Sequence, residues 1–369
     1  MGEHHAPLPA ATTTGTRALT ATAVLLLTLW SASVFAQTPV QVATRDGRHA
    51  LSFGVLGQGL LQFDTATGLP ASNDFCFRRL RFIGGGKVAN KIRLFVDTDA
   101  PYLGEHNTRW SVPPTYLQDL IVTWEASTVF QVDAGLLLVP ASYNSVQSAA
   151  SLLVAGYSPY SFLASAPTHS RVGRDQGVQA RGYLAKKHVE YRAGAYRGAR
   201  KDDPGMPLRY VGRVVFYPFG AQTNFFYTGT MHGKRKLVGI GASLDRQAHF
   251  ASYGADVFGE WPLANGGTLT AQADYIHYDG NRTFVTLPRQ HTWMAEAAYT
   301  AHNRIGVFAQ IAGQNLVSAT RPDAGMFQCG ALYWAKGHRQ NLKLGIGRTY
   351  KDHTPTHTQL LIQSQVFIF

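Results

Sequence analysis

The chain has 369 residues and a formal net charge of +12 at pH 7, from 34 Lys and Arg against 22 Asp and Glu. Gly (37), Phe (20) and Tyr (17) are frequent, whereas charged residues make up only 15%. This composition is typical of alternating β-strands and argues against a helical membrane protein or a disordered chain. The positive charge indicates anionic partners, but it does not define a fold.

The N-terminus has the features of a secretory signal. An apolar run, Ala18–Trp30, follows Arg17 and precedes SASVFA, with a plausible cleavage site after Ala36. The run is shorter than the about 20 residues that a membrane-spanning helix needs. We therefore expect residues 1–36 to be a signal peptide, 37–50 a short periplasmic segment and 51–369 one structural domain. Export argues against a nucleic-acid partner.

From Leu51 onward, apolar and polar residues alternate in segments of about ten residues. In KIRLFVDTD, for example, Ile92, Leu94 and Val96 share one face, and the other face carries charged side chains. A soluble β-sandwich also alternates, but such a domain has about 100 residues and this region shows no linker. The sequence predicts an all-β fold, a transmembrane antiparallel β-barrel.

The pattern gives seventeen candidate strands, and a barrel with both ends on one side of the membrane needs an even number. The short connections should all lie on the periplasmic side. Counted inward from both ends of the chain, they do so only if FFYTGTM, residues 225–231, belongs to an extended turn. Sixteen strands then remain: 51–64, 75–84, 91–99, 116–125, 129–139, 177–185, 188–197, 208–217, 236–245, 250–260, 267–278, 291–300, 304–313, 326–336, 341–350 and 358–369. The glycines of Gly84–Lys87 predict a turn rather than a phosphate-binding loop, because no helix follows them.

One connection, residues 140–176, is too long for a hairpin turn. Loops above about 15 residues that lack regular structure usually have a function. We expect this loop to fold into the barrel and narrow it, with a short helix within 145–154. The alternative is an external loop that covers the mouth.

The inward face of the predicted strands carries more basic than acidic residues. An anion channel needs fixed positive charge there, and the planar guanidinium of Arg suits phosphate oxygens. The candidate pore-lining and anion-binding residues are Arg79, Arg81, Lys91, Arg93, Arg171, Arg174, Arg181, Arg192, Arg209, Arg213 and Lys343. Inward acids are Asp97, Asp99, Asp119, Asp133 and Glu190. Alternatively, neighbouring opposite charges pair and brace the wall.

Outward positions predict contact with a lipid bilayer. The apolar belt includes Phe82, Val122 and Ile346, and the aromatic girdles are expected at Tyr217, Trp261, Trp293 and Trp334. Cys76 and Cys329 lie on non-neighbouring strands and are expected to be free, buried thiols. No catalytic residues, metal ligands or cofactor site are expected. The final strand ends on Phe369 and is expected to be recognised by the barrel-assembly machinery.

Several segments carry a family resemblance. GLLLVPASYNSVQSAASLL, GRDQGVQARGYL, HVEYRAGAYRG, FFYTGT with GKRKL, and the terminal QLLIQSQVFIF together resemble the phosphate-selective porin O and P family. The resemblance implies a trimeric, 16-stranded channel of the Gram-negative outer membrane, with a constricting loop and an arginine-lined lumen. It places Arg79, Arg81, Arg174, Arg181 and Arg192 among the lumen arginines.

The predicted function is passive, anion-preferring diffusion of small solutes, with phosphate or polyphosphate as possible solutes. Two other channel or barrel functions are compatible with the same pattern: a general, weakly selective porin, and a non-conducting barrel used for surface binding. An enzyme on a barrel is disfavoured because no GxSxG motif is present.

Overall fold

The computed structural model describes residues 38–105, 115–161, 173–199, 205–284, 287–317 and 322–369. The expected signal peptide, residues 1–36, and Arg171 lie outside these ranges. No helix within them has the length and apolar character required to cross a membrane.

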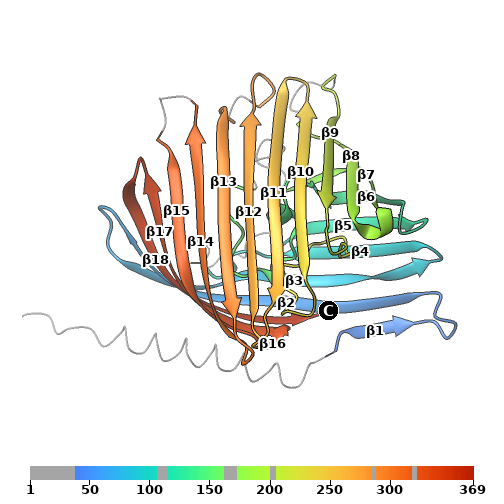
Figure 1. The fold of residues 1–369 in the computed structure, drawn as a ribbon, viewed down its shortest axis with the longest axis horizontal. Coiled ribbons are helices and arrows are strands. Elements are labelled where there is room, and N and C mark those ends of the chain that lie inside the picture. The colour runs from blue at the N-terminus through green and yellow to red at the C-terminus, as the bar shows by residue number, and fades with distance from the viewer. Residues whose placement is uncertain (1–37, 106–114, 162–172, 200–204, 285–286, 318–321) are drawn as a thin grey trace, which may run out of the picture.

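Seventeen strands form one antiparallel sheet, and all except β1 belong to a closed ring. The ring closes where β18 pairs with β2, for example at Ile362↔Leu61. Figure 1 shows β10 to β15 side by side, with the C-terminus and β16 at the lower rim. In chain order the sixteen strands are β2 (Ala50–Ala66), β3 (Ser72–Ala89), β4 (Ile92–Asp99), β5 (Tyr116–Glu125), β6 (Gln131–Leu138), β7 (Arg174–Leu184), β8 (Val189–Tyr196), β9 (Arg209–Phe216), β10 (Leu237–Gln247), β11 (Phe250–Pro262), β12 (Thr268–Asp279), β13 (Gln290–Thr300), β14 (Ile305–Leu316), β15 (Ala324–Tyr333), β17 (Gln340–Lys351) and β18 (Thr354–Ile368).

The predicted barrel and its sixteen strands are confirmed, and residues 225–231 are not a strand of the ring. Two short strands stand outside it: β1 (Val40–Ala43) and β16 (Ala335–His338). β1 pairs with the start of β2, at Val40↔Phe53, just beyond the point where β18 ends opposite Val55.

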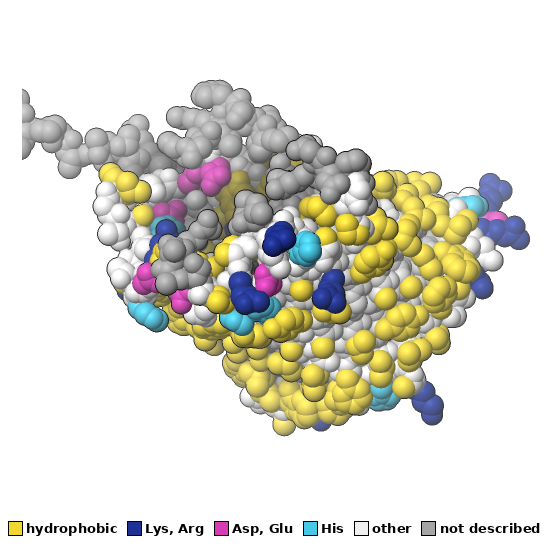
Figure 2. Space-filling model, turned by 90° about the horizontal axis from the view of Figure 1, so that it is seen from above, with side chains coloured by type: hydrophobic (Ala, Val, Ile, Leu, Met, Phe, Trp, Pro, Cys, Tyr) yellow, Lys and Arg dark blue, Asp and Glu magenta, His cyan; other side chains and the backbone are white. Residues whose placement is uncertain are grey.

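Alternation along the strands separates two environments. Phe82, Val122 and Ile346 are exposed on the outer face, whereas their strand neighbours Arg81, Ile121 and Thr123 are buried. Figure 2 shows apolar side chains spread over the outer wall. A sheet with one apolar and one polar face that closes on itself is the arrangement that can cross a bilayer without an unpaired edge.

Several local expectations were wrong. Gly84–Lys87 lies within β3, where Gly84 pairs with Phe53 and Val96 on its two sides, so it is not a turn. Trp261 and Trp293 are exposed as expected of girdle residues, but Tyr217 and Trp334 are buried inside the barrel.

The two cysteines are free thiols, as predicted. Cys76 is buried, whereas Cys329 is partly exposed, so the expectation of two buried thiols holds only for the first.

The long connection after β6 folds into the barrel, as predicted. We call its described part, residues 139–161, the inserted loop. Inward side chains of the wall bind its backbone: Gln58 Nε2 donates to the carbonyl of Ala149 (3.2 Å), and Gln365 Nε2 donates to that of Ala150 (2.8 Å). The helix is shorter than expected. It comprises α2 (Tyr143–Val146), capped by Ser142, and a separate 3-10 turn, η2 (Ala149–Ser151).

A second segment enters the barrel from the opposite rim. Residues 217–236, which we call the inserted turn, connect β9 to β10. The amide of Tyr227 donates to the carbonyl of Val146 (3.0 Å), and the amide of Ser148 donates to the carbonyl of Tyr227 (2.8 Å). The Tyr227 ring stacks on that of Tyr143 with a centroid separation of 4.5 Å. The two insertions therefore meet inside the barrel, where the inserted loop also contacts β12 on one side and β2 and β18 on another.

The carboxylate of Glu260 anchors the inserted turn. It accepts hydrogen bonds from the amides of Met231 (2.6 Å) and Gly233 (2.9 Å) and from the hydroxyl of Thr230 (2.8 Å). Glu260 is 1% exposed, so these donors have little access to competing water.

Glu260→Ala is expected to loosen the inserted turn, because it leaves two backbone N–H groups without an acceptor at a cost of about 1–3 kcal/mol each. Lys234, Arg235 and Lys236 are exposed trypsin sites in the same segment. Trypsin should cleave the variant in lipid vesicles there faster than the unmodified protein. The matched control is Glu125→Ala, since Glu125 is partly exposed and pairs only loosely with Arg93 (3.9 Å). Equal cleavage of both variants would contradict the anchoring role.

Candidate functional site

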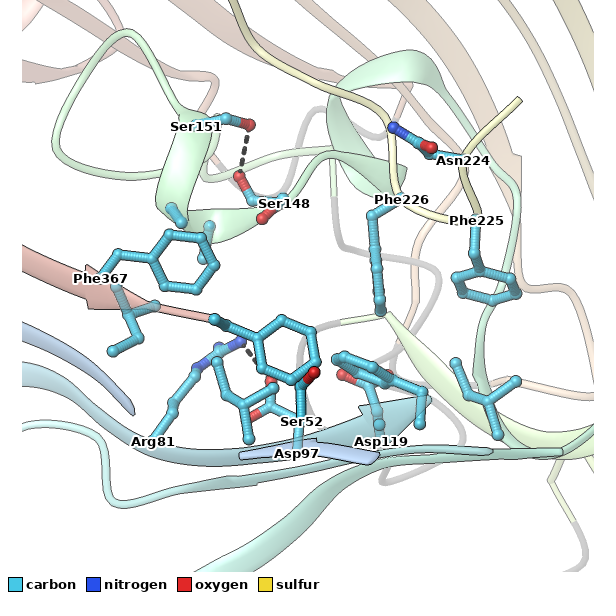
Figure 3. Close-up of a pocket in the computed structure, with 18 of the residues that line it drawn as sticks. Ser52, Arg81, Asp97, Asp119, Ser148, Ser151, Asn224, Phe225, Phe226 and Phe367 are labelled. Carbon is cyan, nitrogen blue, oxygen red and sulfur yellow. Dashed lines mark hydrogen bonds and ion pairs between the residues drawn. The ribbon is translucent and has the colours of Figure 1, made fainter. Parts of the chain in front are cut away.

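A cavity of about 1080 Å³ lies in the lumen beside the two insertions. The inserted loop and the inserted turn bound it on one side, and inward residues of β2 to β5 and β7 bound it on the other. Figure 3 shows Arg81, Asp97 and Asp119 on the strand side and Ser148, Phe225 and Phe226 on the insertion side. Phe369 and Arg339 extend the lining to the rim where the chain ends, which we call the Phe369 rim.

Arginines on the strand side of the cavity are paired with carboxylates. Arg81 donates to Asp97 and Asp99, each at 2.9 Å. Arg174 makes a two-point contact with Asp119, at 3.1 Å from Nε and 2.9 Å from Nη2. Such forked contacts fix both partners and neutralise their charges locally.

The same pairing continues around the wall. Arg181 binds Asp133 (2.8 Å). The remaining arginine pairs on the inner wall are Arg192–Glu190 (2.6 Å), Arg209–Asp245 (2.5 Å), Arg209–Asp175 (3.3 Å) and Arg213–Asp256 (2.5 Å). Each partner is at most 5% exposed. These arginines therefore brace the wall, and their positive charge is largely balanced.

Among the buried side chains of the described ranges, the acids outnumber the cations. Eleven are Asp or Glu and eight are Arg or Lys. Glu260, Asp274 and Glu296 are held by neutral donors: for example, Ser161 Oγ donates to Asp274 (2.9 Å) and Gln310 Nε2 to Glu296 (2.6 Å). The surplus of cations expected from the sequence does not extend over the whole inner wall.

Two buried cations have no carboxylate partner among the described residues. Arg79 donates to the Gln58 side chain (2.6 Å) and lies 5.5 Å from the ring of Tyr157. Lys343 donates to the carbonyls of Leu152 (2.6 Å) and Val154 (3.0 Å). Both therefore lie against the inserted loop, and no carboxylate among the described residues contacts either cation.

A β-bulge brings a further arginine inward. Gln58 pairs with Arg79 but Gly59 pairs with Phe77, so Arg78 is an extra residue in β3. Arg78 Nη1 donates to the hydroxyl of Tyr102 (2.8 Å), and its guanidinium packs on the inserted loop at Gly156. A Cβ at Gly156 would lie 2.3 Å from Arg78 Nη2, so a larger residue there would displace the guanidinium.

The structure thus brings together most of the candidate residues. Arg79, Arg81, Arg174, Arg181, Arg192, Arg209, Arg213 and Lys343 are all buried inside the barrel. Arg93 lines the cavity near the Phe369 rim. Lys91 is not on the inner wall: it lies in the turn between β3 and β4 with a positive φ of 61°, and its amine donates to the carbonyl of Ala126 (3.3 Å).

Sequence reasoning missed one set of inward acids and one basic residue. The acids are Asp175, Asp245, Asp256, Glu260, Asp274 and Glu296. The sequence did contain a signal for Asp256, Glu260, Asp274 and Glu296. These residues lie on predicted strands, at the alternate positions whose side chains point inward. Arg78 had no such signal, because a bulge shifts the phase. No three His, Cys, Asp or Glu side chains in the described ranges gather as a metal site.

A pair of histidines holds the inserted turn against β16. The His232 ring lies 4.6 Å from that of His338 and 4.8 Å from that of Trp334. Burial, together with the charges of Lys234 and Arg304, lowers the pKa of His232 to about 4. Burial, with the charges of His232 and Lys343, lowers the pKa of His338 to about 3. Both rings are therefore neutral at pH 7 in the folded protein.

These lowered pKa values predict a loss of stability in acid. The unfolded chain binds protons near pH 6.5 and the folded histidines do so only below about 4, so stability should fall as the pH drops through this window. In urea unfolding from lipid vesicles, His232→Gln should flatten the pH dependence of the midpoint between pH 7 and 4. His353→Gln, at an exposed turn, is the matched control. An unchanged pH dependence in His232→Gln would refute this role.

Comparisons with known proteins agree with this architecture. The family model for phosphate-selective porin O and P matches residues 58–251, more than half of the chain. No curated protein sequence matches. The chain is similar to the anion-selective porin from Comamonas acidovorans, at 10% identity over 86% of this chain and 99% of that one, with a TM-score of 0.59.

Two further solved structures share the fold. Salmonella typhi OmpF, in complex with daunomycin, is 9% identical over 89% of this chain and 100% of that one, with a TM-score of 0.59. The trimer form of Vibrio cholerae OmpT is 10% identical over 86% and 99%, with a TM-score of 0.53. At such identities the structures establish the fold alone, a closed antiparallel β-barrel. The match of the family model over more than half of its length establishes that the chain belongs to the phosphate-selective porin O and P family.

Proposed function

We propose that this porin allows passive diffusion of small solutes across the outer membrane and favours anions over cations. The observation that carries the proposal is the pair of buried cations, Arg79 and Lys343, that face the inserted loop without a carboxylate partner. A fixed positive charge in a narrow, low-dielectric passage attracts anions and repels cations.

The charged residues that line the cavity also favour anions over cations. Its arginines are Arg81, Arg93, Arg174, Arg181 and Arg339, and its acids are Asp97, Asp119 and Glu125. The surplus is small, and several of these arginines are paired, so the expected preference is modest. Phosphate is one anion that this lining could pass, and the family description is what suggests it.

A weakly selective general porin is the second candidate. The excess of buried carboxylates over buried cations around the whole wall favours it. We further propose an N-terminal signal peptide, a homotrimer and delivery by the barrel-assembly machinery through the strand that ends at Phe369. The trimer form of the Vibrio cholerae structure supports the oligomeric part of this proposal.

Lys343→Gln should lower the ratio of anion to cation permeability by about twofold or more, because it removes a charge in a low-dielectric site. The ratio is measured from the reversal potential across a planar bilayer in a KCl gradient. Lys351→Gln removes an exposed lysine from the same strand and should leave the ratio unchanged.

Asp119→Asn should shift the reversal potential in the opposite direction, because it leaves the Arg174 guanidinium without its carboxylate. A cation-selective reversal potential in the unmodified protein would overturn the proposed preference. A ratio near one that neither variant changes would favour the general porin.

A further inference from the structure

The cavity lining combines a polar wall with an aromatic surface. The polar wall carries Arg81, Arg174 and Arg181 with their carboxylates. The aromatic surface comprises Phe225, Phe226 and Tyr157 of the two insertions, together with Phe95 of β4, Phe367 of β18 and the terminal Phe369. Figure 3 shows the rings of Phe225, Phe226 and Phe367 directed into the cavity that Arg81 and Asp119 border.

The rings form a continuous path. Phe95 packs edge-to-face on Phe226 at 5.1 Å and on Phe369 at 6.0 Å, and Phe225 packs on Phe226 at 4.9 Å. They come from β4, the inserted turn and the C-terminus, segments that are far apart in the sequence. Gly85 leaves space for the rings, since a Cβ there would lie 3.2 Å from the Phe95 ring and 3.3 Å from the Phe369 ring.

This aromatic path is unusual for the passage of hydrated inorganic ions. Apolar surface that faces water is unfavourable by about 25 cal/mol per Å². Phe95 also takes an inward position between Arg93 and Asp97, where the alternation of β4 otherwise places charged side chains. An apolar part of a solute would cover this surface and remove it from water.

The polar wall has limited capacity for more negative charge. Most guanidinium N–H groups there already bind Asp97, Asp99, Asp119 or Asp133. Two buried atoms, Arg81 Nε and Arg181 Nη1, have no hydrogen-bond partner among the described residues. Arg181 is 4% exposed, lines the cavity and lies 5.4 Å from the Phe225 ring. An unused donor beside a ring fits one carboxylate on an aromatic group, whereas Asp97 and Asp119 would repel a phosphate dianion more strongly than a monoanion.

We infer that the cavity is a binding site for aromatic monocarboxylates, in which the solute ring packs on the cavity-facing surface of Phe226 and Phe95 and its carboxylate accepts from the Arg181 guanidinium. This inference rests on the proposed anion preference and names the class of anion. An aromatic ring contributes geometry-dependent contacts in addition to burial, and the carboxylate supplies the acceptor that Arg181 Nη1 lacks.

The test is inhibition of chloride current in planar bilayers by sodium benzoate, sodium acetate and inorganic phosphate at one ionic strength. Benzoate should reach half-inhibition at a concentration about fivefold lower than acetate does, the range expected for a well-placed ring contact. Phe226→Leu and Phe95→Leu keep an apolar side chain but remove the ring, and should reduce this difference to about twofold or less. Phe219→Leu, outside the cavity at an exposed position, should retain it.

Equal half-inhibition by benzoate and acetate in the unmodified protein would overturn the inference, and this comparison needs no variant to fold. So would a benzoate advantage that Phe226→Leu and Phe95→Leu both retain. Reversal potentials in KCl separate the two proposals. An anion-selective channel that benzoate and acetate inhibit equally would contradict only the aromatic site. A cation-selective channel would contradict the proposed function on which the aromatic site rests.

Discussion

The pairing of β18 with β2 is the interaction on which the rest of the structure depends. It closes the antiparallel sheet, so that one face of every strand meets the outside and the other meets a confined interior. Without closure, the polar face with its Arg, Asp and Gln side chains would not enclose an interior. The strands β2 and β18 would then be open edges with unpaired backbone groups. With it, the inward arginines come within reach of acids on neighbouring strands.

Confinement then determines how the interior is filled. Buried charges that lose water must find partners, which explains why pairs such as Arg174–Asp119 and Arg213–Asp256 are so regular. The two insertions lie inside the lumen, and hydrogen bonds between Val146, Tyr227 and Ser148 join them. The cavity lies between them and the wall of β2 to β5 and β7, and its selectivity depends on the few groups whose charges or N–H donors remain unmatched.

The sequence was sufficient for the barrel because its signal, a period of two, repeats along every strand. Even the strand count followed from turn lengths, which excluded residues 225–231. The length of residues 140–176 also predicted an inward loop correctly. These are features that local composition and spacing determine.

Features set by tertiary contacts could not be predicted in the same way. The inserted turn takes its position from Glu260 and Tyr143, which are distant in sequence. Glycines 84–86 suggested a turn, yet Gly85 serves a strand by leaving room for the rings of Phe95 and Phe369. Arg78 turns inward only because of a bulge. The positive lumen was overestimated because acids such as Asp256 and Asp274 were not counted on their own strands.

Hydrogen exchange at individual amides tests the central claim, that two insertions from opposite rims join inside a closed barrel. The amides of Ser148, Tyr227 and Gly229 donate to partners across that junction, at 2.8, 3.0 and 2.9 Å. In the protein reconstituted in lipid, they should exchange as slowly as amides of the neighbouring strands β9 and β10. Exchange as fast as in the exposed turn at Lys186 and Lys187 would contradict the account.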